Sequence, residues 1–399
     1  MTFPQKKLYL ALLILISGMA VAVFWFTWQG IVLNRNYPYN NFLFAPNSSL
    51  SDFTDFLRPH APAGNYFPSA FLVFYPFRGL PPTCAALLFQ GIFILGLLLI
   101  LHANLLRLKL ELKVLLLADL TFIASYPVLI CVDRGNIEIL IAFCIATFLW
   151  LCSKERFGYA LAILLPAICF KFYPGILLLL FCQRNRIHWA IVGALAFFFI
   201  NGGCAWLLPQ HATGVSQQGL RLYTERYVLG DWGTSGTASA WNMFRLVVWL
   251  IRGCWEQTFT WPMPWSMVVV TLDVYYALAF AGFLLVLRHI LYVEKNFFRK
   301  AILLLLYLTV SVPGGGDYKL LHIVIALVVM ILLTGQRPGD LLIVCLLAFS
   351  LIPKQELILP FIDDISASCP DVSIGVILNP MCLLTAMWVI AWGGWQQQN

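Results

Sequence analysis

The sequence predicts an all-α polytopic membrane protein, and its composition and pattern both support this. Of its 399 residues, 61% are hydrophobic and 11% are charged, whereas about 25% of the residues in an ordinary soluble domain are charged. The hydrophobic residues form continuous runs, such as Leu8 to Trp28, Thr83 to Leu106 and Ser373 to Ala391. About 20 such residues cross the hydrocarbon core of a bilayer. A water-soluble fold of this size is therefore excluded.

The first apolar run, the cysteines and the net charge give no support for a cleaved signal peptide, a cysteine-based site or nucleic-acid binding. The run is too long and too aromatic for a cleaved signal, and no small-residue cleavage site follows it, so we expect a retained helix. The eleven cysteines are scattered singly without a C-x-x-C pair, which supports neither disulfides nor a cysteine metal site. The net charge of +7 does not indicate nucleic acid, because the basic residues do not cluster on one polar face.

We expect about 12 transmembrane spans, within a range of ten to thirteen, in one integral membrane domain over residues 1–399. The expected spans lie near residues 8–28, 82–106, 113–131, 136–152, 157–171, 172–183, 187–207, 267–291, 298–313, 317–334, 339–353 and 373–394.

The basic residues predict which side of the membrane each loop occupies. With the N-terminus in the cytoplasm, 14 of the 25 Lys and Arg residues fall in short cytoplasmic segments, as the positive-inside rule expects. These residues are Lys6, Lys7, Arg107, Lys109, Lys113, Lys154, Arg156, Arg184, Arg186, Arg288, Lys295, Arg299, Lys300 and Arg337. The opposite, outer face then holds the long loops 32–81, 208–266 and 353–372, where we expect the active site.

Two segments decide this topology. Residues 157–183 must cross the membrane twice and turn at Lys171-Phe172-Tyr173-Pro174. The alternative is a single tilted span, which would place Arg184 and Arg186 on the outer side. Proline breaks the helix in either case. Ala238 to Ile251 is apolar but carries Arg245. We interpret it as a re-entrant or surface helix.

The first outer loop predicts an interfacial helix. At helical spacing Asp52 and Asp55 lie on one side of a turn, and Phe53, Phe56 and Leu57 form the apolar side. Such a helix would lie in the interface plane with its phenylalanines toward the lipid. The alternative is a solvated charged turn, which the spacing alone favours.

Charged residues also stand at the head of the fourth expected span. Asp133 and Arg134 precede Asn136 and Glu138, and charges at this depth are costly unless they face a polar cavity. A plain turn in which Asn136 caps the next helix is the alternative. It would not explain Glu138, which lies one turn into the membrane.

Two further segments carry candidate site residues. Lys171 is the only cation between Phe157 and Cys182, and an intramembrane charge is a functional candidate, although a lysine near a helix end can also snorkel to the interface. The turn before the tenth span holds three glycines, Asp317 and Lys319, and the span bears His322. Glycines allow close backbone approach to a ligand; a tight hairpin loop is the alternative.

Together these residues suit a lipid phosphate and an activated hydroxyl. Arg and Lys bind phosphate by charge-assisted hydrogen bonds, and a carboxylate can accept a hydroxyl proton. The motifs Asp52-Phe53, Tyr66-x-Pro68, Arg134-Gly135-Asn136 and Lys171-x-Tyr173-Pro174 resemble the polyprenyl-phosphate-sugar-dependent glycosyltransferases of the GT-C membrane fold, especially the bacterial mannosyltransferase branch of glycosyltransferase family 87. Pro313 to Tyr318 is a looser match, and the order agrees over about residues 50 to 320.

The resemblance implies catalysis on the outer face beneath the first loop. Two positions depart from the family pattern: Asn136 stands where Gln is common, and Asp55-Phe56 occupies the region of the usual Asp-Phe-x-x-Tyr. We hypothesise that Asp52 is the general base, with Asp55 in reserve. The donor phosphate would be held by Arg134, Lys171 and Tyr173, and the sugar or the cations would be oriented by Asp133, Asn136, Glu138, Asp317, Lys319 and His322.

The expected reaction is inverting transfer of mannose or glucose from a polyprenyl phosphate, at the outer face of a bacterial cytoplasmic membrane. The acceptor stays open among lipopolysaccharide or O-antigen repeats, glycolipids and other cell-envelope glycans. We expect no obligatory metal or other cofactor, although Asp52 and Asp55 together could hold a hard cation.

Two other classes are less favoured. A secondary transporter or flippase would also bury charges in broken helices, but residues 1 to 200 and 200 to 399 show no internal repeat. A membrane acyltransferase would want a histidine-centred site, and the six histidines are isolated.

Overall fold

The structure is a computed structural model of the chain. It describes residues 2–32, 67, 69–77, 79–182, 186–207, 238–247, 265–313, 316–354 and 373–396. The expected interfacial helix around Asp52 and Asp55 lies outside these residues, as does most of the three long loops.

The described residues are almost entirely helical. The first half contains α1 Phe3–Val32, α4 Ala70–Phe74, η1 Tyr75–Phe77, α5 Pro82–Leu105, η2 Leu106–Leu108, α6 Leu112–Ile123, α7 Tyr126–Arg134, α8 Glu138–Ser153 and α9 Phe157–Phe170. The second half contains η3 Tyr173–Phe181, α10 Ile187–Leu207, α14 Trp265–Arg288, η6 His289–Val293, α15 Phe297–Ser311, η7 Asp317–Leu320, α16 Leu321–Leu332, α17 Asp340–Ser350 and α18 Gly375–Gln396.

The chain is a multi-pass membrane protein. Among the described residues, five helices are long and apolar enough to cross a membrane, namely those of Phe3–Phe24, Pro82–Leu108, Ile187–Leu207, Val270–Val293 and Gly375–Gln396. The bent pair α6 and α7 adds a sixth candidate, and α8, α9 and α17 are shorter apolar helices. The count of twelve spans stays a prediction.

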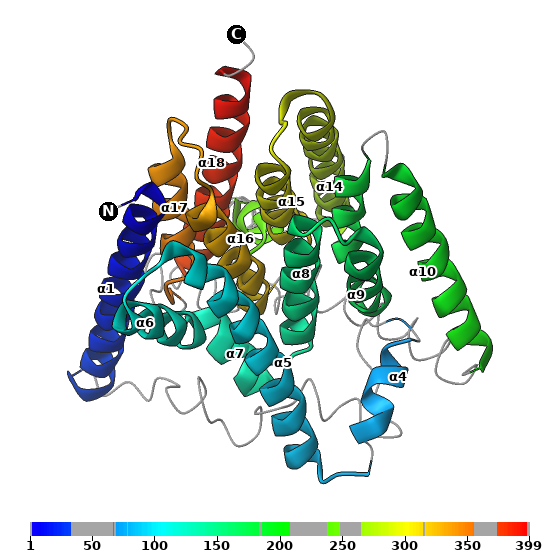
Figure 1. Cartoon of the computed structure of the whole chain (residues 1–399), viewed down its shortest axis with the longest axis horizontal. Helices are drawn as coiled ribbons and strands as arrows, with labels where there is room; N and C mark the ends of the chain where they lie inside the picture. Colours follow the sequence, from blue (N-terminus) through cyan, green and yellow to red (C-terminus); the bar gives the residue numbers. More distant parts are fainter. Residues whose placement is uncertain are drawn as a thin grey trace, which may run out of the picture.

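Helices α8 and α16 form the centre of the bundle, with α1, α17 and α18 to one side and α10 and α14 to the other (Figure 1). Most residues of α8 and α16 are buried, as expected for a helix that is hydrophobic all round. The outer helices instead expose large apolar side chains, such as Leu99 on α5, Phe199 on α10 and Phe280 on α14. Lipid is the natural solvent for these side chains.

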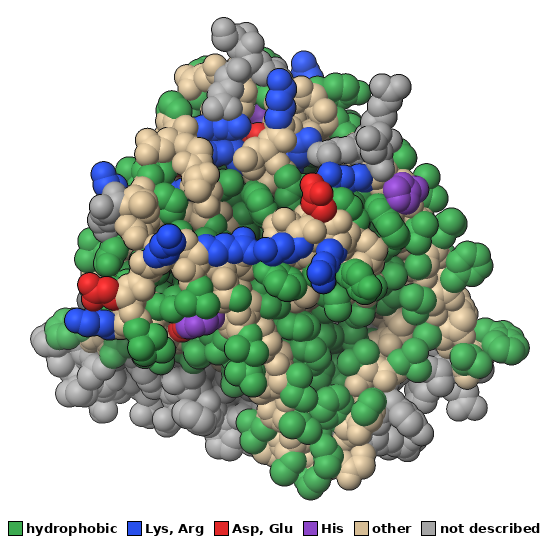
Figure 2. Space-filling model, in the orientation of Figure 1, with side chains coloured by type: hydrophobic (Ala, Val, Ile, Leu, Met, Phe, Trp, Pro, Cys, Tyr) green, Lys and Arg blue, Asp and Glu red, His purple; other side chains and the backbone are tan. Residues whose placement is uncertain are grey.

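Basic side chains join the helix ends at one end of the bundle. Lys7 of α1 is fully buried, and its ammonium donates to the carbonyls of Met330 and Leu333 at the end of α16. Arg299 pairs with Asp340, and Arg337 pairs with Glu294. We call this end, with Lys7, Arg107, Lys154, Arg299 and Arg337, the basic face. Lys and Arg lie in the upper two thirds of the surface visible in Figure 2, and the described surface below them is mainly hydrophobic.

The chain turns back within residues 157–183, as predicted. The rings of Phe157, which begins α9, and Phe181, which ends η3, lie 6.0 Å apart between centroids, so a single continuous span is excluded. The second arm is a 3-10 helix rather than an α-helix. Because a 3-10 helix rises about 2.0 Å per residue, its nine residues reach about 18 Å instead of the roughly 13 Å of an α-helix.

The structure describes two other expected segments, the second of them in part. The expected span at 113–131 consists of two helices, α6 and α7, bent by 53°, and the break coincides with Pro127 in the first turn of α7. Within 238–251 the structure describes a helix over residues 240–247. It begins beside α15, where the hydroxyl of Ser239 donates to the carbonyl of Val312 at 2.7 Å. Residues 248–251 lie outside the described part of the chain, so the expected re-entrant or surface helix stays a prediction.

Candidate active site

The Arg134-Gly135-Asn136 motif forms the junction between α7 and α8. Gly135 ends α7 in the left-handed conformation, with φ of 62°, which glycine adopts without steric cost. The side-chain oxygen of Asn136 accepts the backbone N–H of Glu138 at 2.9 Å, and its carbonyl accepts a bond from the Gln90 amide. Asn136 therefore binds the first backbone N–H of α8 from one residue before the N-cap position, Ile137, close to the capping role that the simpler sequence interpretation predicted. This bond also fixes where Glu138 enters the bundle.

Glu138 is the centre of a buried polar cluster at the end of the bundle opposite the basic face. Its side chain is fully buried, and Lys171 Nζ lies 2.7 Å from its Oε1. The Tyr173 hydroxyl donates to Oε2, and His322 Nε2 lies 3.5 Å from the same oxygen. The structure thus brings together four predicted site residues from α8, the α9–η3 break and the start of α16.

The break between α9 and η3 places Lys171 and Tyr173 at this carboxylate. Lys171 ends α9 with an extended backbone, φ −139° and ψ 132°, and Pro174 follows in the first turn of η3. In a continuous α-helix Pro174 would have no N–H for the carbonyl of Phe170 and its ring would clash with that carbonyl, so the α-helix ends before it. Lys171 is 9% exposed. It is therefore held inside the protein instead of snorkelling to water.

The turn at η7 brings three more side chains to the cluster. Tyr318 places its ring 5.6 Å from Lys171 Nζ and 5.9 Å from the Arg134 guanidinium carbon, within the range of cation–π attraction. Lys319, 4% exposed, lies 5.3 Å from the ring of Tyr173. Arg134, Lys171 and Lys319 therefore surround two aromatic rings in one small region.

Asp317 occupies the edge of the same cluster. Its carboxylate, 1% exposed, accepts the hydroxyl of Tyr126 at 2.5 Å. Lys354, 3% exposed, lies close enough to interact with its charge, while its ammonium donates to the carbonyls of Phe349 and Ile352. We call the group Arg134, Glu138, Lys171, Asp317, Lys319 and Lys354, with their tyrosine and histidine partners, the site cluster.

Basic groups outnumber acidic groups in the site cluster. Among the described side chains it holds four basic groups and two carboxylates. Burying like charges together is costly unless an opposite charge joins them. The arrangement therefore favours a bound anion, and the guanidinium and ammonium groups are suited to phosphate oxygens.

The described residues leave three predicted site residues unplaced. Asp52 and Asp55 lie outside the described part of the chain, and the side chain of Asp133 is not described. The roles predicted for these three residues therefore stay predictions. All the other predicted site residues lie in the site cluster or at the α7–α8 junction.

Comparison with known families gives the class of protein. The model of glycosyltransferase family 87 matches residues 65–313, which is more than half of the chain. The chain belongs to glycosyltransferase family 87. It is therefore a membrane glycosyltransferase, as the short motifs in the sequence predicted. No curated protein and no solved structure matches the chain.

The family match covers part of this glycosyltransferase's site cluster. Arg134, Glu138 and Lys171 lie inside the matched range, whereas Asp52 precedes it and Asp317 follows it. Sequence reasoning gave no role to three cluster residues, Tyr126, Tyr318 and Lys354. Tyr126 shows no signal beyond its place at a helix start, and Tyr318 lies in the Pro313 to Tyr318 match.

Proposed function

We propose that this glycosyltransferase transfers one hexosyl unit, mannose or glucose, from a polyprenyl-phosphate carrier to a hydroxyl of a glycan or glycolipid acceptor. The site cluster carries this proposal, because among the described side chains its basic groups outnumber its carboxylates, and such groups suit a phosphate. A lipid-linked donor also fits a site inside a membrane bundle, since the isoprenoid chain can remain in the bilayer while the phosphate enters.

The cation-rich group would stabilise the leaving phosphate. When the bond between the anomeric carbon and the phosphate oxygen breaks, the phosphate takes the electron pair and its negative charge increases. Arg134, Lys171 and Lys319 are placed within one cluster, and preorganised positive groups act most strongly where charge develops in a water-poor site. In this proposal Glu138 and Tyr173 orient Lys171, and His322 packs against both.

The acceptor hydroxyl needs a base, and we assign Asp52 to that role. The oxygen of the acceptor hydroxyl attacks the anomeric carbon on the face opposite the phosphate, and Asp52 takes the proton of that hydroxyl. The product therefore has inverted configuration. Loss of a general base typically lowers the rate by about 10²-fold or more. Asp52→Asn is expected to lose transfer to that extent, while Asp55→Asn retains most of it; full activity of Asp52→Asn contradicts the assignment.

Sidedness supports placing the reaction at the outer surface of a bacterial cytoplasmic membrane. The site cluster lies at the end of the bundle opposite Lys7, Arg299 and Arg337, and α8 alone separates the ends by about 24 Å, from 16 residues at 1.5 Å each. The positive-inside rule assigns the basic face to the cytoplasm.

The experiment is a transfer assay with purified protein. Radiolabelled polyprenyl-phosphate mannose and polyprenyl-phosphate glucose are each incubated with a panel of glycolipid and polysaccharide acceptors. Product is expected with one donor, and no product with Lys171→Met. Lys113→Met, an exposed change on the basic face, is the matched control and should keep full activity. Transfer only from a nucleotide sugar, or undiminished transfer by Lys171→Met, would overturn the proposal.

A further inference from the structure

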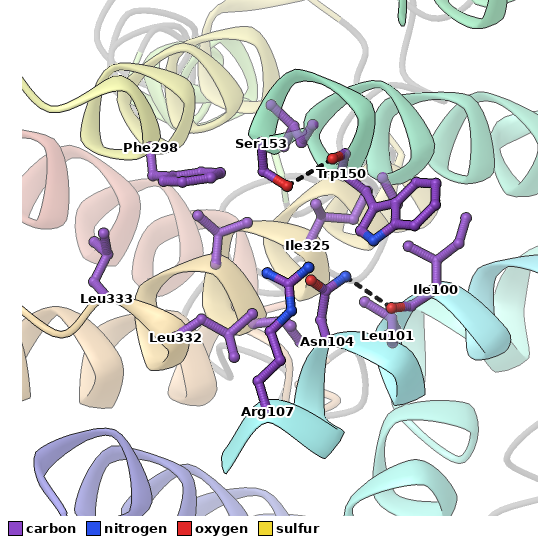
Figure 3. A pocket seen from close by; sticks show the side chains of 14 residues that line it. Ile100, Leu101, Asn104, Arg107, Trp150, Ser153, Phe298, Ile325, Leu332 and Leu333 are labelled. Carbon is purple, nitrogen blue, oxygen red and sulfur yellow. Dashed lines mark hydrogen bonds between the residues drawn. The ribbon is translucent and has the colours of Figure 1, made fainter. Parts of the chain in front are cut away.

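A cavity opens at the basic face, far from the site cluster. It has a volume of about 120 Å³ and is lined by the ends of α5, α8 and α16 and the start of α15. Arg107, Asn104, Trp150 and Ser153 line its polar part, and apolar side chains such as Leu149 and Val328 line the rest. Figure 3 shows the guanidinium of Arg107 pointing into the cavity, next to the amide of Asn104.

The cavity has a polar rim and an apolar floor. Ser153 and Leu332 stand at the ends of their helices, whereas Ala146 and Ile325 line the cavity seven residues deeper. Seven helical residues rise about 10 Å, so the cavity runs from the basic face into the bundle. Its volume is slightly below that of a 150 Å³ apolar cavity that holds benzene, which corresponds to a short segment of a hydrocarbon chain.

The cation at the rim differs from its neighbours at the basic face. Arg299 and Arg337 each bind a carboxylate through both guanidinium nitrogens. Within the described part of the chain Arg107 has no ion-pair partner and is exposed. The nearby loop adds Lys109, also exposed, so the rim has a local excess of positive charge.

We propose that this cavity binds an anionic phospholipid of the leaflet at the basic face. The phosphate would lie against Arg107, with the indole N–H of Trp150 beside it, and the first carbons of one acyl chain would enter the apolar floor. Basic pockets between transmembrane helices on the cytoplasmic side bind anionic head groups in this way. A zwitterionic lipid fits less well, because its amine would approach Arg107 and Lys109.

The site is separate from sugar transfer. It lies at the opposite end of α8 from Glu138, and the bound lipid would contact four helices, α5, α8, α15 and α16. A ligand that binds only the folded protein raises its melting temperature. We therefore expect phosphatidylglycerol to stabilise the protein more than phosphatidylcholine does, whether or not the donor site is intact.

The test uses photoreactive phospholipids. The full chain, in phosphatidylcholine nanodiscs, receives either phosphatidylglycerol or phosphatidylcholine carrying a diazirine near the start of one acyl chain, and labelled peptides are identified by mass spectrometry. Labelling of residues 146–153 and 325–333 is expected to be about 5-fold higher with phosphatidylglycerol. Both lipids carry the phosphate, but only phosphatidylcholine brings a quaternary ammonium group toward Arg107 and Lys109.

Three variants sharpen the test. Arg107→Ala should lose this preference, and Ala146→Phe, which fills the floor and keeps the charge, should lose labelling of both segments. Lys113→Ala, an exposed change outside the cavity lining, is the matched control and should label as the native chain does. If Ala146→Phe does not fold, Arg107→Ala alone tests the proposal. Arg107 is exposed, so its replacement should not affect folding.

Three results would overturn the proposal. These are equal labelling by the two lipids, unchanged labelling in Arg107→Ala, and displacement of the phosphatidylglycerol probe by polyprenyl phosphate or inorganic phosphate at lower concentration than by unlabelled phosphatidylglycerol. The last result would assign the cavity to another phosphate compound.

Discussion

The two ends of the bundle bury charged side chains in different ways. At the basic face, Arg299 Nη1 and Nη2 lie 2.8 and 2.9 Å from the two oxygens of Asp340. Arg337 binds Glu294 in the same two-point manner, at 2.5 and 3.0 Å. Arg299 and Arg337 are thus each matched to one carboxylate, and the two pairs join the helix ends of α14, α15 and α17.

In the described part of the chain, the site cluster shares its contacts among several side chains. Glu138 is shared by Lys171, Tyr173 and His322, and Arg134 and Lys319 lie against tyrosine rings. The comparison teaches that burial alone does not separate structural from functional charges in a membrane bundle. The pattern of pairing differs instead. Arg299 and Arg337 each bind one carboxylate at two points, whereas in the proposed donor site Lys171 shares Glu138 with a tyrosine and a histidine.

The largest expected effect is loss of a matched pair at the basic face. Asp340→Ala leaves Arg299 buried, at 3% exposure, without its carboxylate, and breaking a buried pair costs about 3–5 kcal/mol. The free energy of unfolding in detergent should fall by that amount, while transfer per folded molecule stays unchanged.

The matched control for that change is Glu111→Ala. Glu111 pairs with Lys113 at 3.8 Å on the exposed surface, with side chains 74% and 86% exposed. Exposed pairs contribute about 0–1 kcal/mol, so this variant should unfold as the native chain does. A loss in Asp340→Ala no greater than in Glu111→Ala would show that the basic-face pairs are not structural.

Acid should weaken the second pair. Burial alone would raise the pKa of Glu294, but hydrogen bonds from Arg337 and from the backbone of Asn296, with the Arg337 charge, hold its pKa below the ordinary value. Because that pKa is depressed in the folded state, the pair adds stability above the ordinary carboxyl range, about pH 4.3, and loses it as the pH falls through the lowered pKa.

The measurement is the melting temperature between about pH 6 and pH 3, near and below the ordinary glutamate range. Arg337→Met should melt lower than the native chain at the upper pH and lose less stability on acidification. Equal pH slopes for the two proteins would mean that the Glu294 pair does not contribute to acid sensitivity.

A smaller effect is expected from the ring between two cations of the site cluster. Tyr318→Leu removes the aromatic face next to Lys171 and Arg134, and a cation–π contact contributes about 0.5–2 kcal/mol. Transfer measured as kcat/KM should fall roughly 2- to 30-fold. Tyr318→Phe keeps the ring and should stay close to native; an equal loss in both variants would assign the effect to the hydroxyl.

No effect is expected from removal of metal ions. The proposed leaving phosphate is stabilised by Arg134 and Lys171, so the transfer rate in EDTA should equal the untreated rate. Loss of transfer that Mg²⁺ or Mn²⁺ restores would show instead that a hard cation, held for example by Asp52 and Asp55, takes part.

The sequence predicted much of the site because charge is conspicuous in an apolar chain. Lys171 and Glu138 could be singled out since neither is tolerated in lipid without a partner. Pro174 marked the break that brings them together, and Asn136 marked the start of α8. These signals are local, so they can be read without knowing the fold.

The partners of distant residues could not be predicted. Tyr126 and Asp317 are 191 residues apart in the chain, and Arg299 and Asp340 are 41 apart. Their contacts follow from how the helices pack. The positive-inside rule assigns Arg299 to the cytoplasmic side but does not identify its partner. The bend between α6 and α7 was missed for a similar reason, because Pro127 is compatible with a helix start as well as with a span.

The most direct test of the central claim, that the site cluster binds the donor phosphate, is a double variant. Lys171→Met leaves Glu138 without its ammonium, and Lys171→Met with Glu138→Gln removes both charges. Replacing both partners of a buried pair can be nearly neutral for stability, whereas removing one is costly. Melting temperature and transfer from the polyprenyl-phosphate hexose are measured for both variants and for Arg299→Met with Asp340→Asn.

The account predicts that each double variant regains stability over its single variant. Only the basic-face double variant should keep transfer, and the Lys171 and Glu138 double variant should stay about 10²–10³-fold below the native rate, the loss typical of one removed transition-state donor. Near-native transfer by the Lys171 and Glu138 double variant would contradict the account, because the cluster would then be another matched structural pair.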